Sequence, residues 1–407
     1  MKAQSTTLPP ELLNVRAAAL KALEELEPAG VPRSDSEGRG LMLSAQTDGG
    51  RSLPPYYLVY FLLIDLLGFP SLGRWEKTAW TVPVRYRGRL YGIEHRKMGL
   101  GVFAPNLDPA ARMSGTPNEQ AEEDARAITM LITKAVSIAE PYFQWRAEQA
   151  VSTPGLNVVN KSDILFDRYE YFRDRFRTLL DDAESRKFER SIENKTLSDG
   201  TVITIGSSPS FVLRREAVWN AQAAIEAFFS WTEHVLIHLT ILQSKLRSGD
   251  DVARLAESDW KAKFKAALDV ADPHTKLHYD RLLDLRAQVR NFVAHGAFGK
   301  SGEAFSFHSG AGASPVVLTN NQRHKFSLTG RPAFDERMAI ENIESFLLHL
   351  WSGVRAPARH YIFSSLPSIL SYVVDGTYAQ AMRSDDEMKR FVEHLSGEFD
   401  RAADMDW

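Results

Sequence analysis

The chain has 407 residues, of which 44% are hydrophobic and 25% charged, and its mean hydropathy is -0.27. This composition is that of a globular protein with two or three domains, and it excludes disordered and collagen-like classes for the bulk of the chain. Cysteine is absent, which excludes disulfides, thiolate metal sites and cysteine nucleophiles. The net charge of -3 provides no overall positive field for nucleic acid, although a local basic site stays open.

The N-terminal region predicts a cytoplasmic protein without a membrane segment. Its first residues lack the apolar core of a signal peptide. The longest apolar run, 56–67, is interrupted by Asp65 and is far shorter than the roughly 20 residues that span a bilayer. We therefore expect a helix over 10–27, a loop rich in Gly, Ser and Pro over 28–55, and a buried helix over 56–67.

A strand-rich block follows. Residues 81–86 and 90–93 flank Arg87-Gly88-Arg89 and predict a β-hairpin, and 100–104 predicts a third strand. The series Thr116-Pro117-Asn118-Glu119 has the order of a capping box, which indicates a helix running towards residue 149 with a kink near Pro141.

The remainder of the chain is predicted to be mostly helical. Expected helices cover 162–190, a long apolar segment from 211 to about 247, 258–271, 275–295 and 333–352. A loop with a short strand is expected over 191–210, and strand-like pieces occur at 304–307 and 315–318. The predicted fold class is therefore mostly α, with an α+β domain over 1–200, a helical bundle with a small strand insertion over 205–355, and a helical extension over 356–407.

Candidate chemistry concentrates in residues 282–296, Leu-Leu-Asp-Leu-Arg-Ala-Gln-Val-Arg-Asn-Phe-Val-Ala-His-Gly. The apolar residues of this helix form one stripe, whereas Asn291 and His295, four residues apart, share the opposite face and Arg290 lies at the stripe's edge. An arginine can hold a phosphate through paired hydrogen bonds, and a histidine can take or give a proton near neutral pH. This set requires no metal and no cofactor. The alternative is an ordinary solvated helix end.

The run Arg290-Asn291-Phe292-Val293-Ala294-His295 resembles the arginine, polar residue and histidine signature of HEPN domains. The aromatic, acid-containing helix at 228–236 is similar to the family's first long helix, and Trp260-Lys261-Ala262-Lys263-Phe264 resembles its second. The resemblance implies a helical bundle that forms a homodimer and cleaves RNA without a metal. Arg290 would then bind the scissile phosphate, Asn291 would position the site, and His295 would act as general base or acid while the ribose 2′-OH attacks. Some HEPN domains are silent binding modules, so this alternative stays open.

Glu233 completes the predicted site, because the family's recurring acid in this helix could hydrogen-bond Arg290 or another motif residue across the bundle. The same helix places His234 and His238 four residues apart, which suggests zinc, but the order Glu-His-x-x-x-His is not that of zinc proteases. Hydrogen-bonded histidines of the core or of an interface are the favoured interpretation of this pair.

The predicted hairpin supplies two further alternatives. Its basic residues alternate with aromatic ones, as in surfaces that stack bases, although a solvated sheet face is the favoured interpretation; the residues are Arg85, Tyr86, Arg87, Arg89, Tyr91, His95, Arg96 and Lys97. Asp65, Glu94 and Lys97 could instead form a magnesium-dependent nuclease site, but their spacing departs from the usual Glu-x-Lys strand.

Three functions are therefore carried forward. The first is a metal-independent endoribonuclease acting in bacterial anti-phage defence or as a toxin. The second is a non-catalytic RNA-binding or dimerisation module of a defence complex. The third is a metal nuclease in the N-terminal half, which is otherwise expected to be a regulatory or sensing domain that binds a trigger or partner.

Overall fold

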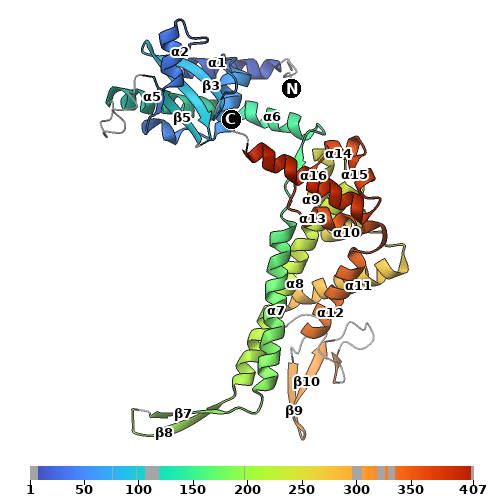
Figure 1. Ribbon diagram of the computed structural model, residues 1–407. Helices are drawn as coiled ribbons and strands as arrows, with labels where there is room; N and C mark the ends of the chain where they lie inside the picture. The colour runs from blue at the N-terminus through green and yellow to red at the C-terminus, as the bar shows by residue number, and fades with distance from the viewer. Residues whose placement is uncertain are drawn as a thin grey trace. The chain divides into compact units, whose positions relative to one another are not determined.

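The fold was described from a computed structural model covering residues 8–75, 77–97, 99–105, 119–196, 198–295, 305–318, 326–328 and 335–404. The chain is mostly helical, with a small antiparallel sheet in its N-terminal part (Figure 1). It divides into two compact units, Met1–Ala150 with Phe399–Trp407, and Val151–Glu398. This division falls earlier than the boundary near residue 200 suggested by the sequence, because α7 (Ser162–Ser185) packs along α8 (Pro209–Leu242) rather than with the sheet.

The first unit is built around a five-stranded antiparallel sheet with the order β1-β3-β4-β5-β2. The strands are β1 (Leu26–Pro28), β2 (Ala45–Gln46), β3 (Thr78–Tyr86), β4 (Arg89–Arg96) and β5 (Gly99–Ala104). The predicted β3–β4 hairpin is confirmed, and its turn residues Arg87 and Gly88 both have positive φ, the backbone conformation that favours a tight two-residue turn. Val82, Val84 and Ile93 are fully buried and form the centre of the core.

Helices complete this unit. They are α1 (Pro10–Ala22), α2 (Asp35–Met42), α3 (Tyr56–Tyr60), which continues as a π-helical segment over Phe61–Leu66, α5 (Glu119–Ile138) and α6 (Glu140–Val151). The predicted buried helix at 56–67 is confirmed, since Leu62, Leu63 and Leu66 are inaccessible to solvent. The break between α5 and α6 confirms the kink predicted near Pro141, whereas the capping box at 116–119 lies largely outside the described residues.

The loop predicted over 28–55 is wrong. This segment contains α2, β2 and a 3-10 turn at Gly49–Ser52, while residues 26–28 form a strand rather than the end of the first helix. Its order comes from contacts distant in sequence: β2 pairs with β5, and the carboxylate of Glu122 accepts hydrogen bonds from the backbone N–H groups of Asp48 and Gly49 at 2.9 and 2.7 Å. The local sequence signal for a helix in this segment is Ser34, whose side chain caps α2.

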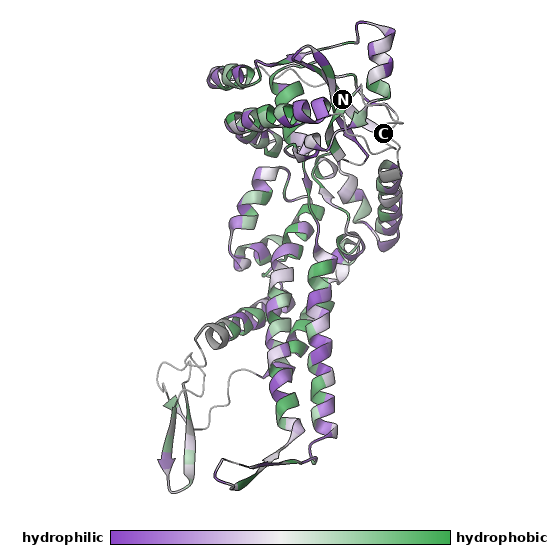
Figure 2. Cartoon of the chain, turned by 90° about the vertical axis from the view of Figure 1, so that its left-hand side faces the viewer, coloured by the Kyte–Doolittle hydropathy of each residue, from purple (hydrophilic) through white to green (hydrophobic). Residues whose placement is uncertain are grey.

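The second unit contains the long antiparallel pair α7 and α8, which a two-stranded ribbon joins at one end (Figure 1). The segment 191–210, expected to be a loop with a short strand, contains two ribbon strands: β8 (Val202–Ser207) confirms the expected strand, and β7 (Ser191–Thr196) replaces part of the loop. Hydrophilic and hydrophobic stretches alternate along the two long helices (Figure 2), as expected for helices that pack on one side and meet solvent on the other.

Shorter helices pack against α8 and complete a helical bundle. They are α9 (Gly249–Glu257), α10 (Trp260–Ala267), α11 (Pro273–His295) and α12 (Glu336–Leu350). Helix α9 was not predicted from the sequence, because Ser248-Gly249-Asp250 is also typical of a helix end, whereas in the structure Ser248 caps the start of the next helix. Trp231, Phe228, Trp260 and Phe346 form the aromatic centre of this core.

The strand insertion and the C-terminal helices follow α11. The strands are β9 (Phe305–Ser309), β10 (Gly312–Leu318) and β11 (Phe326–Ser327), with β10 between the other two. Two short strands, β6 (Asn157–Val158) and β12 (Ser368–Ile369), pair with each other. The chain ends in α13 (Ala358–Ile362), α14 (Ser371–Val374), α15 (Thr377–Ala381) and α16 (Asp385–Asp404), which agrees with the predicted helical extension.

Candidate functional site

The predicted motif lies in the last turns of α11, which extends to His295 as the sequence predicted. Leu282, Leu285 and Val289 of this helix are 1%, 5% and 6% exposed, so the described part of the apolar stripe is confirmed as core. The backbone of residues 290–295 is helical, but their side chains lie outside the part of the chain that the structure describes. The roles of Arg290, Asn291 and His295 therefore stay predictions.

Glu233 of α8 faces α10 and α11 and is held by two cations. Its Oε1 accepts a hydrogen bond from Nη2 of Arg286 at 2.8 Å, and its Oε2 accepts one from Nζ of Lys263 at 3.2 Å. Glu233 therefore bonds across the bundle to α11, whereas its expected bond to Arg290 or another motif residue stays a prediction, because those side chains lie outside the described part of the chain. Its partner among the described side chains of α11 is Arg286, four residues before Arg290.

Lys263 and Arg286 were not singled out by sequence analysis, although each carries a signal. Lys263 occupies the i+3 position of an apolar stripe formed by Trp260, Phe264 and Ala267, and a cation in such a stripe needs a buried counterion. Arg286 precedes Arg290 by four residues and therefore shares its side of the helix. Neither signal identifies a functional residue until the acid on the facing helix, Glu233, is known.

The C-terminal end of α12 packs against the first turns of α11. His349, near the C-terminal end of α12, bonds through Nε2 with Oγ1 of Thr275 at 2.8 Å and stacks on His278, so α11 and α12 are antiparallel. Asp335 caps α12 by accepting a hydrogen bond from the N–H of Met338.

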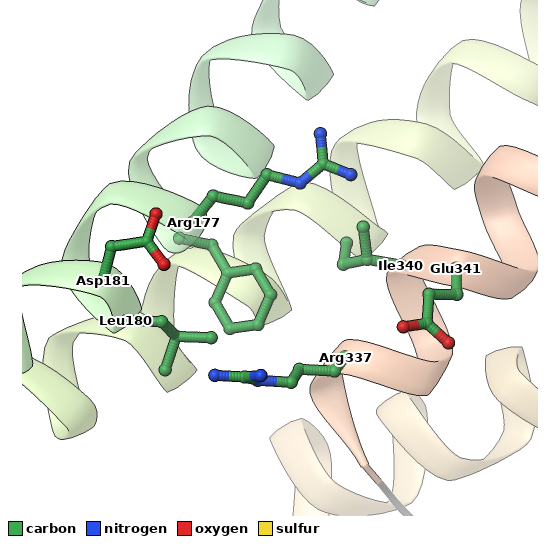
Figure 3. Close-up of a pocket in the computed structure, with 7 residues that line it drawn as sticks. Arg177, Leu180, Asp181, Arg337, Ile340 and Glu341 are labelled. Atoms are coloured by element: carbon green, nitrogen blue, oxygen red, sulfur yellow. The ribbon is translucent and has the colours of Figure 1, made fainter. Parts of the chain in front are cut away.

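A pocket of about 300 Å³ opens between α7 and the first turns of α12 (Figure 3). It is lined by Phe176, Arg177, Leu180, Asp181, Arg337, Ile340 and Glu341. Arg177 is anchored to Glu344 of α12 by two hydrogen bonds of 2.6 and 2.7 Å, while Arg337 extends across the pocket towards Leu180 (Figure 3). Its mixture of apolar, cationic and anionic groups suits a polar ligand rather than a purely apolar one.

The histidine pair of α8 is engaged in hydrogen bonds inside the second unit. Nδ1 of His238, which is 1% exposed, bonds with Oγ of Ser368 at 2.8 Å, and Nε2 of His234 accepts from the N–H of Lys161 at 2.9 Å. Burial lowers the pKa of both rings, that of His238 to about 3. These contacts confirm the interpretation of hydrogen-bonded core histidines.

The basic residues of the β3–β4 hairpin are mostly paired within their own unit. Arg85 bonds to Glu37 at 2.6 Å, Arg89 to Asp124 at 2.5 Å, and Arg96 to Glu94 at 2.6 Å. Tyr86 and Tyr91 are only 2% and 3% exposed, so they belong to the core and not to a solvated sheet face. One aromatic contact is at the surface: His95 stacks on the half-exposed Tyr56 with ring centroids 4.2 Å apart.

The residues of the alternative magnesium site have other partners. Asp65 accepts hydrogen bonds from the hydroxyl of Tyr142 at 2.6 Å and from Nε of Arg146 at 3.2 Å. Glu94 is fully buried, and burial raises the pKa of its carboxyl group in spite of Arg96. Among the described residues no group of three or more His, Asp or Glu side chains is arranged to hold a metal ion.

Comparisons with known proteins found no matching family model, no similar curated protein and no similar solved structure. In the described part of the chain, none of the helices combines the length and the apolar character needed to cross a membrane.

Proposed function

We propose that this protein is a metal-independent endoribonuclease of the HEPN type, acting in the cytoplasm in bacterial anti-phage defence or as a toxin. The observation that carries the proposal is the position of the motif Arg290-Asn291-x-x-x-His295 in the final turns of a bundle helix. The acid of the facing helix, Glu233, is directed at this same helix through Arg286. This arrangement supports a phosphate-handling site, since an arginine and a histidine would meet at one helix end.

The proposed reaction follows from the chemistry of the two motif residues. The ribose 2′-oxygen attacks the adjacent phosphorus, the bond from phosphorus to the 5′-oxygen breaks, and the products carry a 2′,3′-cyclic phosphate and a 5′-hydroxyl. His295 takes the proton of the 2′-OH or gives one to the leaving oxygen, and Arg290 neutralises charge on the phosphate. Because the 2′-OH is the nucleophile, RNA is cleaved and DNA is not.

The active form is proposed to be a homodimer in which two bundles bring their motifs together. The first unit is proposed to be the regulatory part, which binds the trigger or partner that activates the bundle. Its own core and sheet are separate from those of the second unit, which fits a division between sensing and cleavage.

The test is cleavage of a mixed RNA pool in EDTA by the wild type and by His295→Ala, with oligomeric state measured for both. Loss of acid–base catalysis should slow cleavage by about 10²- to 10⁴-fold. His274→Ala, at the other end of α11, is the matched control and should cut at the wild-type rate. Cleavage that survives His295→Ala would refute the mechanism, and RNA binding without cleavage by any variant would favour the non-catalytic RNA-binding and dimerisation module.

A further inference from the structure

A cluster of three charged side chains links three helices of the bundle one turn before the motif. Glu233 of α8 lies between Lys263 of α10 and Arg286 of α11, with contacts of 3.2 and 2.8 Å. The guanidinium carbon of Arg286 also lies 5.7 Å from the ring centre of Phe229 and 5.8 Å from that of Trp260. Arg286 is therefore fixed by a carboxylate and two aromatic rings before any ligand arrives.

The charges of this cluster do not balance. Two cations face one carboxylate, which leaves a net charge of +1 among the three side chains. Lys263 is 6% exposed and needs Glu233 as its counterion, whereas Arg286 is 40% exposed. The excess positive charge is thus at the solvent side, on the residue that belongs to the motif helix.

Arg286 retains the capacity to bind an anion. A guanidinium has five N–H donors in a planar fork, and the bond to Glu233 uses only one edge of it. Because the group is already held in place, binding a phosphate would cost little side-chain entropy. Arg286 and Arg290 are four residues apart, about 6 Å along the helix axis, so an anion at Arg286 would lie next to one at Arg290.

We propose that Arg286 binds an RNA backbone phosphate adjacent to the one that is cleaved, an inference that rests on the proposed function. Glu233 is then a positioning residue: it neutralises Lys263 and aims the guanidinium of Arg286, and it takes no part in proton transfer. The site recognises phosphate charge and not a base, so it contributes affinity without sequence preference.

The experiment measures RNA binding by the full chain in the His295→Ala background, where cleavage does not interfere. Arg286→Gln, Arg286→Lys and Arg281→Gln are compared, the last being an exposed arginine earlier on α11. We expect Arg286→Gln to weaken binding about 10- to 100-fold and to reduce the slope of affinity against salt by about one phosphate contact. Arg286→Lys should keep the slope, and Arg281→Gln should change neither quantity.

A second probe does not depend on RNA cleavage. Inorganic pyrophosphate should raise the unfolding temperature of the wild type and of Arg281→Gln, but much less that of Arg286→Gln. A purely structural role would lower the unfolding temperature of both Arg286 variants without altering the salt slope or the pyrophosphate effect, and that result would overturn the inference while leaving the proposed function intact. The opposite outcome is also distinguishable. If Arg286→Gln loses both the salt dependence and the stabilisation by pyrophosphate while His295→Ala still cleaves RNA at the wild-type rate, Arg286 is a phosphate-binding residue and the proposed cleavage mechanism is refuted.

The role of Glu233 is tested by Glu233→Gln in the otherwise unaltered protein. Since the variant removes the charge that aims Arg286, we expect KM for RNA to rise with a smaller change in kcat. A fall in kcat with unchanged KM would assign Glu233 to the chemical step and overturn its positioning role.

Discussion

His238 makes the second unit sensitive to acid in a way that can be measured. The ring is 1% exposed, its Nδ1 is bonded to Ser368, and burial lowers its pKa from an ordinary 6.5 to about 3. The folded protein therefore keeps this side chain neutral at pH values where the unfolded chain binds a proton. We predict that the free energy of unfolding decreases as the pH is lowered and that His238 accounts for a calculable part of this decrease.

The size of the effect follows from proton linkage. The folded pKa lies below the unfolded one, so the contribution of His238 is complete above about pH 6.5 and is lost progressively as the pH falls towards 3. Each pH unit within this window costs about 1.4 kcal/mol. Between pH 7 and pH 5 the loss due to His238 alone is therefore about 2 kcal/mol.

Urea unfolding followed by circular dichroism at pH 7 and pH 5 would test this value. His238→Asn keeps a polar atom near Ser368 but cannot titrate, so its loss between the two pH values should be smaller than that of the wild type by about 2 kcal/mol. Ser368→Ala should lose about 1 kcal/mol at both pH values and retain the wild-type dependence. Equal pH-dependent losses in the wild type and His238→Asn would refute the reasoning.

Two further substitutions test the buried polar contacts of each unit. Asp124→Asn removes the fully buried carboxylate that accepts hydrogen bonds from Arg89 and Tyr91, and it should lower the free energy of unfolding of the first unit by about 2 to 3 kcal/mol. The loss is smaller than for an ion pair in which both partners are buried, because the partly exposed Arg89 can be hydrated again. Asn160→Ala leaves two backbone carbonyls of the turn 362–366 without their donor, which should destabilise the second unit by about 2 to 5 kcal/mol. Urea unfolding measures both, and an unchanged midpoint in either variant would contradict the corresponding account.

Local patterns in the sequence predicted the elements that depend on local forces. The β3–β4 hairpin was predicted from Arg87-Gly88-Arg89 between two strand-like segments, and the structure places the turn at Arg87 and Gly88, both with positive φ, and Arg89 in β4. The apolar period of α11 likewise predicted that Leu282, Leu285 and Val289 are buried. In these cases a turn preference or a helical repeat is enough to determine the element.

Elements held by distant partners were missed. Residues 28–55 have a loop-like composition, but Glu37 pairs with Arg85 and β2 adds to the edge of the sheet. In the ribbon β7–β8, by contrast, the second strand was expected from the sequence, and β7 was missed because it has little hydrophobic pattern of its own. Sequence periodicity does not reveal such contacts, because they depend on which segments the tertiary fold brings together.

The candidate site shows the same limit. A short motif on a helix end was visible in the sequence, and an acid in α8 was correctly expected to face that helix. The partners of this acid could not be predicted, because Lys263 and Arg286 are brought to the same carboxylate only when α10 and α11 pack against α8. A charge within an apolar stripe indicates that a counterion exists, and the fold is needed to say which one it is.

The two units differ in how their arginine side chains are paired with carboxylates. In the first unit, three of the four arginines that suggested a nucleic-acid surface, Arg85, Arg89 and Arg96, each face a carboxylate, and two of these carboxylates, Asp124 and Glu94, are fully buried. Breaking such pairs to bind phosphate would leave a buried negative charge, which is costly. Arg286 in the second unit shares its carboxylate with Lys263, so it can bind a phosphate while Glu233 keeps a counterion. RNA backbone contacts are therefore expected on α11, and a trigger recognised by the β3–β4 hairpin would have to bind without displacing the partners of Arg89 and Arg96.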